Sequence, residues 1–243
     1  MQDQIIRDGD LAGNNVTHIE IEVEGDEWAE GIDLSDTLVT AIPEDNKAIL
    51  EKIKMCGVVG LGGATFPAHV KLCPPPGKKA DCLILNGAEC EPYLTSDYRR
   101  MIENPEELVA GMKIILQLFD NAKAIFGIEN NKPDCIAILK EKTIDEPRIV
   151  VTRLKTKYPQ GAERQLIYAT TKRKLNSSML PADVGCVVNN VDTIVAIYNA
   201  VVKRKPLMER IVTITGEAVA NPQNMRVHIG TNYHELIEVA GGF

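Results

Sequence analysis

The chain has 243 residues, of which 44% are hydrophobic and 25% are charged, and its formal net charge at pH 7 is -7. This composition is ordinary for a soluble globular protein, and the excess of acidic residues argues against a nucleic-acid partner. No apolar run approaches the ~20 residues that a transmembrane helix needs, so we expect no direct membrane span.

The first predicted element is a strand at residues 17–24, where apolar and charged residues alternate. With glycines close by, residues 1–25 are typical of the end of a small β domain. Residues 45–56 have helical spacing and an acidic start, and a run of glycines ends this predicted helix.

Short apolar runs then alternate with amphipathic segments. The predicted strands are 82–85, 123–129, 148–154 and 184–188, and the predicted helices are 105–119, 133–142, 161–171 and 191–202. Because these strands are apolar throughout, they favour a parallel sheet with helices on its faces. In such sheets ligands bind beyond the carboxyl ends of the strands, so the loops at those ends are candidate binding loops.

The pattern changes near residue 210. A strand, a turn at Asn221-Pro222, a second strand ending in VHIG and a short helix at 232–240 follow in that order. Two strands and a helix arranged in this way predict half of a β-grasp unit, whose remaining strands are expected beyond residue 243.

The first candidate binding loop is the stretch GVVGLGGATFPAHVKL. Gly60, Gly62 and Gly63 leave one surface without side chains, where backbone amides can face a flat ring or a phosphate. Phe66 is placed to lie against such a ring, and Lys71 offers a compact cation for a phosphate. The spacing alone fits a ligand-binding loop and a purely structural turn equally well.

The loop after the strand at 82–85 carries Asn86, Glu89 and Glu91. An asparagine offers a donor and an acceptor, and carboxylates accept hydrogen bonds from ribose or ribityl hydroxyls. An acidic turn that caps the next helix is an equally good interpretation of this loop taken alone.

Two further loops complete the set. In KYPQGAE, Tyr158 precedes Gly161, which would leave bare amides at the positive end of a helix. In NNVDT, the pair Asn189-Asn190 with Thr193 precedes a helix, and by itself this pattern is typical of a simple N-cap.

Catalytic and metal-binding patterns are missing from the sequence. The 4 histidines do not cluster, and no nucleophile–histidine arrangement is visible, so we predict no catalytic side chain. The 6 cysteines form no C-x-x-C pair, so we predict no metal ligands in this chain. Both results are compatible with hydride and electron transfer, which a cofactor performs itself.

Taken together and in this order, the four loops are far more specific than any one of them. The motifs G-L-G-G-A-T-F-P…K, N-G-A-E-C-E-P, Y-P-Q-G-A-E and V-N-N-V-x-T resemble the flavoprotein subunit of respiratory complex I. Within that family they are most similar to the branch formed by the C subunits of Rnf electron-transport complexes. The closing stretch VTITGEAVANP…IGT…ELIEVAGGF is similar to the SLBB (β-grasp) segment of the same family.

The resemblance implies an α/β fold with a Rossmann-like parallel sheet flanked by helices at residues 26–208. It implies the tail of an N-terminal barrel-sandwich-like domain at 1–25 and the start of an SLBB unit at 209–243. The implied cofactors are FMN and NAD(H). The family's 4Fe-4S clusters belong to a C-terminal domain that is absent from this chain.

Carried over position by position, the resemblance also implies the binding residues. Its FMN contacts would be Gly60, Gly62, Lys71, Asn86, Glu89, Tyr158, Gly161, Asn189, Asn190 and Thr193. NADH would stack over the flavin near Gly63 and Phe66, with Glu91 reaching the nucleotide and Glu163 behind the site.

Four positions depart from the complex I pattern. Leu61 replaces an arginine, Thr65 replaces a glycine, and Ala88 and Ala162 stand where acids help to hold the flavin and the nucleotide. These replacements favour the Rnf-like branch, which shares them.

The function implied by the resemblance is that of an electron-entry module in an Rnf-type NAD:ferredoxin oxidoreductase. Such a module binds FMN and NADH and passes electrons between nicotinamide and iron–sulfur centres. Its partners would be the other subunits of the membrane complex and, indirectly, ferredoxin, and it would be cytoplasmic and peripheral on the inner face of the plasma membrane. Two alternatives stay open: a component of a soluble reductase for proline or cobalamin reduction, and a non-redox scaffold whose flavin site has decayed.

Overall fold

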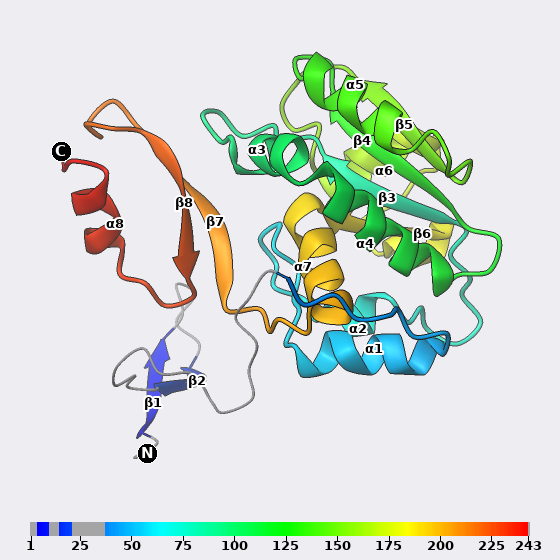
Figure 1. The fold of residues 1–243 in the computed structure, drawn as a ribbon, viewed down its shortest axis with the longest axis horizontal. Helices are drawn as coiled ribbons and strands as arrows, with labels where there is room; N and C mark the ends of the chain where they lie inside the picture. Colours follow the sequence, from blue (N-terminus) through cyan, green and yellow to red (C-terminus); the bar gives the residue numbers. More distant parts are fainter. Residues whose placement is uncertain (1–3, 10–14, 21–36, 243) are drawn as a thin grey trace. The chain divides into compact units, whose positions relative to one another are not determined.

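The computed structural model of the chain describes residues 4–9, 15–20 and 37–242 (Figure 1). The chain divides into two units, Met1–Ser35 and Asp36–Phe243. In the first unit, strand β1 (Gln4–Gly9) pairs antiparallel with β2 (Asn15–Glu20). The predicted strand at 17–24 overlaps β2, and its last four residues lie outside the described residues.

The second unit is built on a four-stranded sheet of order β5-β4-β3-β6. Its strands are β3 (Cys82–Gly87), β4 (Lys123–Glu129), β5 (Ile149–Leu154) and β6 (Cys186–Asn190), and every neighbouring pair is parallel. The predicted parallel sheet is therefore confirmed. β6 runs two residues further than predicted because Asn189 and Asn190 still pair with Leu85 and Asn86 of β3.

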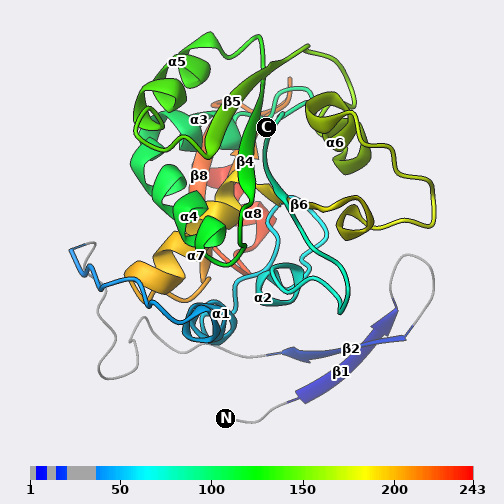
Figure 2. The ribbon, with the colours of Figure 1, turned by 90° about the vertical axis from the view of Figure 1, so that its right-hand side faces the viewer.

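Helices cover both faces of this sheet (Figure 2). The helices of this unit that precede the C-terminal segment are α1 (Asn46–Met55), α2 (Ala68–Lys71), α3 (Ser96–Glu103), α4 (Pro105–Gln117), α5 (Pro133–Lys142), α6 (Glu163–Thr171) and α7 (Val191–Val202). Figure 2 shows α4, α5 and α7 on one side of the sheet and α6 on the other.

The burial of β3 explains why its sequence is a continuous apolar run. Leu83 and Leu85 are buried in the core that α4 and α7 complete, whereas Cys82 and Ile84 are buried in the smaller core beneath α6. Because successive side chains of a strand point to opposite faces, a sheet covered on both faces needs apolar residues at every position.

The helix α3 is a difference from the sequence prediction. Its sequence SDYRRMIE is mostly polar, and Met101 is its buried residue, so apolar periodicity carries little signal there. α4 begins directly after it at Pro105, as predicted from the Asn104-Pro105 start signal.

The C-terminal segment consists of an antiparallel hairpin, β7 (Glu209–Ile214) and β8 (Gln223–His228), followed by α8 (Tyr233–Val239). This order of elements is the predicted one. The domain boundaries predicted from the sequence remain predictions, since the one near residue 25 falls outside the described residues. Among the described helices, none is long and apolar enough to cross a membrane.

Candidate functional site

A cleft of about 660 Å³ lies where β3 and β6 end. Its volume is in the range of small-molecule and cofactor sites. Every residue predicted to bind a cofactor lines it: Gly60, Gly62, Gly63, Phe66, Lys71, Asn86, Glu89, Glu91, Tyr158, Gly161, Glu163, Asn189, Asn190 and Thr193. The fold thus brings the four loops together, while their contacts with a cofactor remain a prediction.

The glycine loop is closed by its own backbone and tied to α7. The Gly60 amide donates to the Phe66 carbonyl at 2.9 Å, and the Leu61 amide donates to Thr193 Oγ1 at 2.9 Å. A Cβ added at Gly62 would lie 3.1 Å from the Cβ of Asn190, so packing against α7 already favours a glycine there. Gly63 has φ +125°, a conformation that other residues rarely adopt.

Asn190 links α7 to α3. Its Oδ1 accepts from the amides of Asp192 at 2.9 Å and Thr193 at 3.4 Å, which confirms the N-cap interpretation. Its Nδ2 donates to Asp97 Oδ2 at 2.8 Å. Asn190 therefore caps the helix and also lines the cleft.

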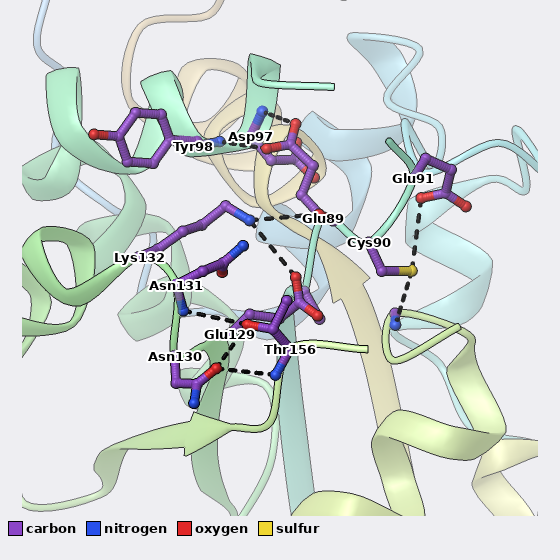
Figure 3. A network of polar contacts seen from close by, with 12 residues as sticks. Glu89, Cys90, Glu91, Asp97, Tyr98, Glu129, Asn130, Asn131, Lys132 and Thr156 are labelled. Atoms are coloured by element: carbon purple, nitrogen blue, oxygen red, sulfur yellow. Dashed lines mark hydrogen bonds and ion pairs between the residues drawn. The ribbon is translucent and has the colours of Figure 1, made fainter. Parts of the chain in front are cut away.

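Glu89 caps α3, the helix that the sequence did not reveal (Figure 3). Its Oε1 accepts from the Asp97 amide at 2.9 Å, and its Oε2 accepts from the Tyr98 amide at 3.2 Å. The alternative interpretation of an acidic cap is thus correct for Glu89, and a carboxylate at a positive helix end is electrostatically favourable.

Asn86 and Gly161 hold two of the loops together. Asn86 Nδ2 donates to the Gly161 carbonyl at 2.8 Å, and the Gly161 amide donates to Cys90 Sγ at 3.3 Å. The amide that we predicted to be bare at Gly161 is thus engaged by a thiol. Burial raises the pKa of the Cys90 thiol, so it accepts this bond in its neutral form.

The rim of the cleft carries aromatic and charged side chains. Phe66 is 50% exposed and Tyr158 is 69% exposed, so both rings offer free faces for stacking. Lys71 Nζ lies 3.6 Å from Glu163 Oε1, a loose ion pair that leaves the ammonium donors open to a ligand. Tyr158 joins Pro159 through a cis peptide bond.

Asp97 is a cleft residue that the sequence analysis missed. Burial and the nearby carboxylates of Glu89 and Asp192 raise its pKa to about 8. The sequence signal that marks it is weak, since an acid in the first turn of a polar segment has a simpler explanation as a helix-dipole partner. Asp192, in contrast to Asp97, forms an ion pair within the described part of the chain, in which Arg100 Nε donates to its Oδ1 at 2.6 Å.

Asp97→Asn is expected to change how stability depends on pH. The native carboxyl keeps its proton up to about pH 8, whereas the unfolded one loses it near its ordinary value of about 3.9. The parent chain should therefore lose stability as the pH rises between these values. The variant has no such proton to lose, so its free energy of unfolding in urea should vary less between about pH 5 and pH 9. If the free energy of unfolding changed with pH equally in parent and variant, the raised pKa of Asp97 would be contradicted.

A second, smaller cleft of about 410 Å³ adjoins the first and shares Glu89, Glu91, Leu94 and Tyr158 with it. Figure 3 shows Lys132 pointing toward Glu89 and Glu129. Lys132 Nζ lies 3.7 Å from Glu129 Oε2 and 3.4 Å from the Glu89 carbonyl. This ion pair is buried, with the Glu129 side chain 1% exposed.

Among the described residues, no group of three His, Cys, Asp or Glu side chains is placed to hold a metal ion.

Comparison with protein families gives two matches. Residues 53–199 match the family described as the Nuo51 FMN-binding domain, and residues 211–243 match the SLBB domain.

The chain is also similar to curated C subunits of ferredoxin:NAD(+) oxidoreductase complexes. The chain is 50% identical over 226 residues to the C subunit of a proton-translocating ferredoxin:NAD(+) oxidoreductase complex of Clostridium ljungdahlii, covering 93% of this chain and 49% of that protein. It is 43% identical over 236 residues to the C subunit of a Na(+)-translocating ferredoxin:NAD(+) oxidoreductase complex of Acetobacterium woodii. That match covers 96% of this chain and 52% of that protein. The chain thus spans about half the length of these relatives.

Solved structures show the same fold. An NAD+-reducing NiFe hydrogenase superposes with a TM-score of 0.70 and 24% identity in its H2-reduced state, and with 0.71 and 26% in its air-oxidized state. Each covers 82% of this chain and 40% of the hydrogenase chain. The family match, the parallel sheet and the cleft at its carboxyl end show that this chain belongs to the Nuo51 FMN-binding domain family and carries an SLBB segment after that domain.

Proposed function

We propose that this chain binds FMN and NADH in the larger cleft and serves as the electron-entry module of an Rnf-type NAD:ferredoxin oxidoreductase. The observation that carries the proposal is the convergence of four loops, from residue 60 to residue 193, on one cleft of about 660 Å³. The names of the two relatives, each the C subunit of a ferredoxin:NAD(+) oxidoreductase complex, supply the reaction.

The residues of the cleft fit the chemical parts of FMN. Phe66 and Tyr158 offer exposed rings for a flat isoalloxazine, and the glycine loop offers a surface with few side chains. Lys71 suits a phosphate, since its ammonium is positive and its ion pair with Glu163 is loose. Bound FMN would supply hydride and single-electron transfer, so the chain itself needs no acid–base catalyst.

The role of the chain is to hold and orient its ligands. Thr193 and Asn190 anchor the glycine loop and α3 to the first turn of α7, which makes the cleft rigid before a ligand arrives. Glu91 is exposed at the boundary of the two clefts and is placed to accept a hydrogen bond from a nucleotide hydroxyl. Asp97, when protonated, adds a neutral hydroxyl donor to the same cleft.

The wider assignment is part of the same proposal. The iron–sulfur centres that receive the electrons belong to parts outside this chain, and the partners are the other subunits of the membrane complex. The expected location is the cytoplasmic side of the plasma membrane, where the chain would be a peripheral component.

Reconstitution with FMN tests the proposal directly. The chain should take up FMN at one per molecule, and anaerobic NADH should bleach the visible flavin band. A chain that binds FMN without bleaching would favour a different electron donor, such as that of a soluble reductase. A chain that takes up no FMN would favour the scaffold alternative, to which Ala88 and Ala162 in the cleft lend support.

Lys71→Ala is expected to weaken FMN binding about tenfold, because the phosphate would lose its charge-assisted contact with the ammonium of Lys71. Flavin fluorescence quenching measures the dissociation constant. Lys54→Ala is the matched control, since Lys54 on α1 also forms a loose ion pair, with Glu51 at 4.0 Å, and is not among the cleft-lining residues. Equal FMN affinities for the parent and both variants would show that Lys71 does not bind the phosphate.

A further inference from the structure

The SLBB hairpin contributes to the wall of the larger cleft. Arg210 and Ile211 of β7 line this cleft together with the loops of the parallel sheet. Arg210 Nη2 donates to the carbonyl oxygen of Leu61 at 3.4 Å, although the two residues are 149 positions apart in the chain. A guanidinium from the C-terminal segment therefore stands beside the glycine loop.

The hairpin is attached to the lip of the cleft by a set of side-chain hydrogen bonds. Asn224 Nδ2 donates to Thr95 Oγ1 at 3.0 Å and to the Thr95 carbonyl at 3.3 Å. The Thr95 amide donates to Thr213 Oγ1 at 3.3 Å, and Thr213 Oγ1 donates to Asn224 Oδ1 at 2.7 Å. Thr95 is the N-cap residue of α3. The hairpin is therefore fixed to the helix that contains Asp97 and whose first turn Glu89 caps.

Among the described residues, the cleft is lined by more acids than cations. The acids are Glu89, Glu91, Asp97, Glu163 and Asp192, and the cations are Lys71 and Arg210. Lys71 already has Glu163 at 3.6 Å. No carboxylate of the described chain forms an ion pair with Arg210, whose polar contact is the long one to Leu61.

The charges next to Arg210 do not neutralise it. Glu209, its neighbour on β7, is approached by Arg226 at 4.0 Å and by His228 at 3.9 Å, both on β8. Successive side chains of a strand point to opposite sides, so Glu209 and Arg210 face different surroundings. Arg210 is thus an exposed cation on the cleft wall, and no acid of the described residues pairs with it.

We propose that Arg210 is a binding residue for a phosphate group of the ligand in the cleft, so that the SLBB hairpin completes the binding site. This inference rests on the proposed function for the identity of the ligand, and it adds a residue from outside the FMN-binding domain. A guanidinium matches phosphate geometry with paired donors, and a wall already fixed by hydrogen bonds needs little ordering when the ligand binds. The phosphate is that of FMN or the pyrophosphate of the dinucleotide.

Binding measurements on the full chain test this role. Arg210→Gln should weaken the affinity for FMN, measured by fluorescence quenching, or for the dinucleotide, measured by calorimetry with NAD+ on the FMN-loaded chain, by about tenfold. NAD+ is used because it carries the same pyrophosphate as NADH and does not reduce the flavin. Which ligand loses affinity identifies the phosphate that Arg210 contacts. Arg210→Lys keeps the charge, so it should recover part of the lost affinity. Higher salt should reduce the difference in affinity between the parent and Arg210→Gln.

Arg226→Gln is the matched control, because Arg226 lies on the adjacent strand and is not among the lining residues. Its affinities should equal those of the parent, and the melting temperatures of all variants should agree. Affinities of Arg210→Gln within twofold of the parent for both ligands would overturn the inference.

Inorganic pyrophosphate separates this inference from the proposed function. A parent chain that binds no FMN or NADH, yet binds pyrophosphate with an affinity that Arg210→Gln reduces, would refute the proposed function alone. A parent chain that binds none of the three would overturn both. Binding of all three by the parent with no loss in Arg210→Gln would leave the proposed function intact and remove the role of Arg210.

Discussion

Replacing Gly161 with alanine should destabilise the chain by at least about 2 kcal/mol and weaken FMN binding together with it. A Cβ at this position would overlap the carbonyl oxygen of Ala88, a contact with backbone that no side-chain rotation can relieve. The loops after β3 and β5 would have to separate, which would also break the bond from Asn86 to the Gly161 carbonyl. Urea unfolding of the ligand-free chain measures the loss of stability.

Gly60→Ala is the control for this prediction. Gly60 lines the same cleft, but a Cβ there would meet nothing closer than 3.6 Å. Its effect on the free energy of unfolding should stay within about 1 kcal/mol, because alanine fits the space and restricts the unfolded chain. Equal stabilities for the two variants would show that the contact between Gly161 and Ala88 does not constrain the loops.

Lys132→Met should cost about 3 kcal/mol of stability, because it leaves the carboxylate of Glu129 buried without its cation. The Lys132 side chain is 10% exposed and that of Glu129 is 1% exposed, so water can replace little of the lost interaction. The Lys157 amide, which donates to Glu129 Oε1 at 3.2 Å, is too weak a partner to compensate fully. The midpoint of urea unfolding should fall while its slope stays the same.

A double variant separates the buried charge from the packing. Lys132→Met with Glu129→Gln removes both charges, and it should recover most of the stability lost by Lys132→Met alone. Arg99→Gln is the exposed control, since Arg99 and Glu103 are about half exposed and their pair should be worth less than about 0.5 kcal/mol. A loss for Lys132→Met no larger than for Arg99→Gln would show that water reaches Glu129.

The fold was predictable from the sequence to a large extent because its signals are local. The strands at 82–87, 123–129 and 149–154 and the helices at 105–117 and 133–142 carry apolar runs, prolines at helix starts and turn residues within a few positions. The helix α3 escaped because its residues are polar and its first turn is capped by Glu89, seven residues before Ser96. A cap supplied from another loop leaves no pattern of its own in the sequence.

The residues of the cleft were predictable for a different reason. Those after residue 80 lie in loops that follow a predicted strand or in the first turn of the helix that comes next, and parallel strands deliver such loops to the same edge of a sheet. The glycine loop at 60–71 instead follows the predicted helix at 45–56, and it was predicted from its motif. Their detailed contacts were not predictable, since Asn86, Gly161 and Glu89 bond to partners in other loops or helices. From the sequence we predict that these residues contact a ligand, and the structure shows that they hold the loops in place.

By itself, the sequence determined the alternation of strands and helices, the parallel sheet and the loops that form the cleft, because hydrophobic periodicity and turn chemistry act over short stretches of chain. Only the tertiary structure decided which charges meet. It placed Asp97 near the carboxylates of Glu89 and Asp192, buried Lys132 against Glu129, and brought Arg210 to the glycine loop. The physical reason is that the free energy of a charge depends on its burial and on its neighbours, which packing sets between residues far apart in the chain.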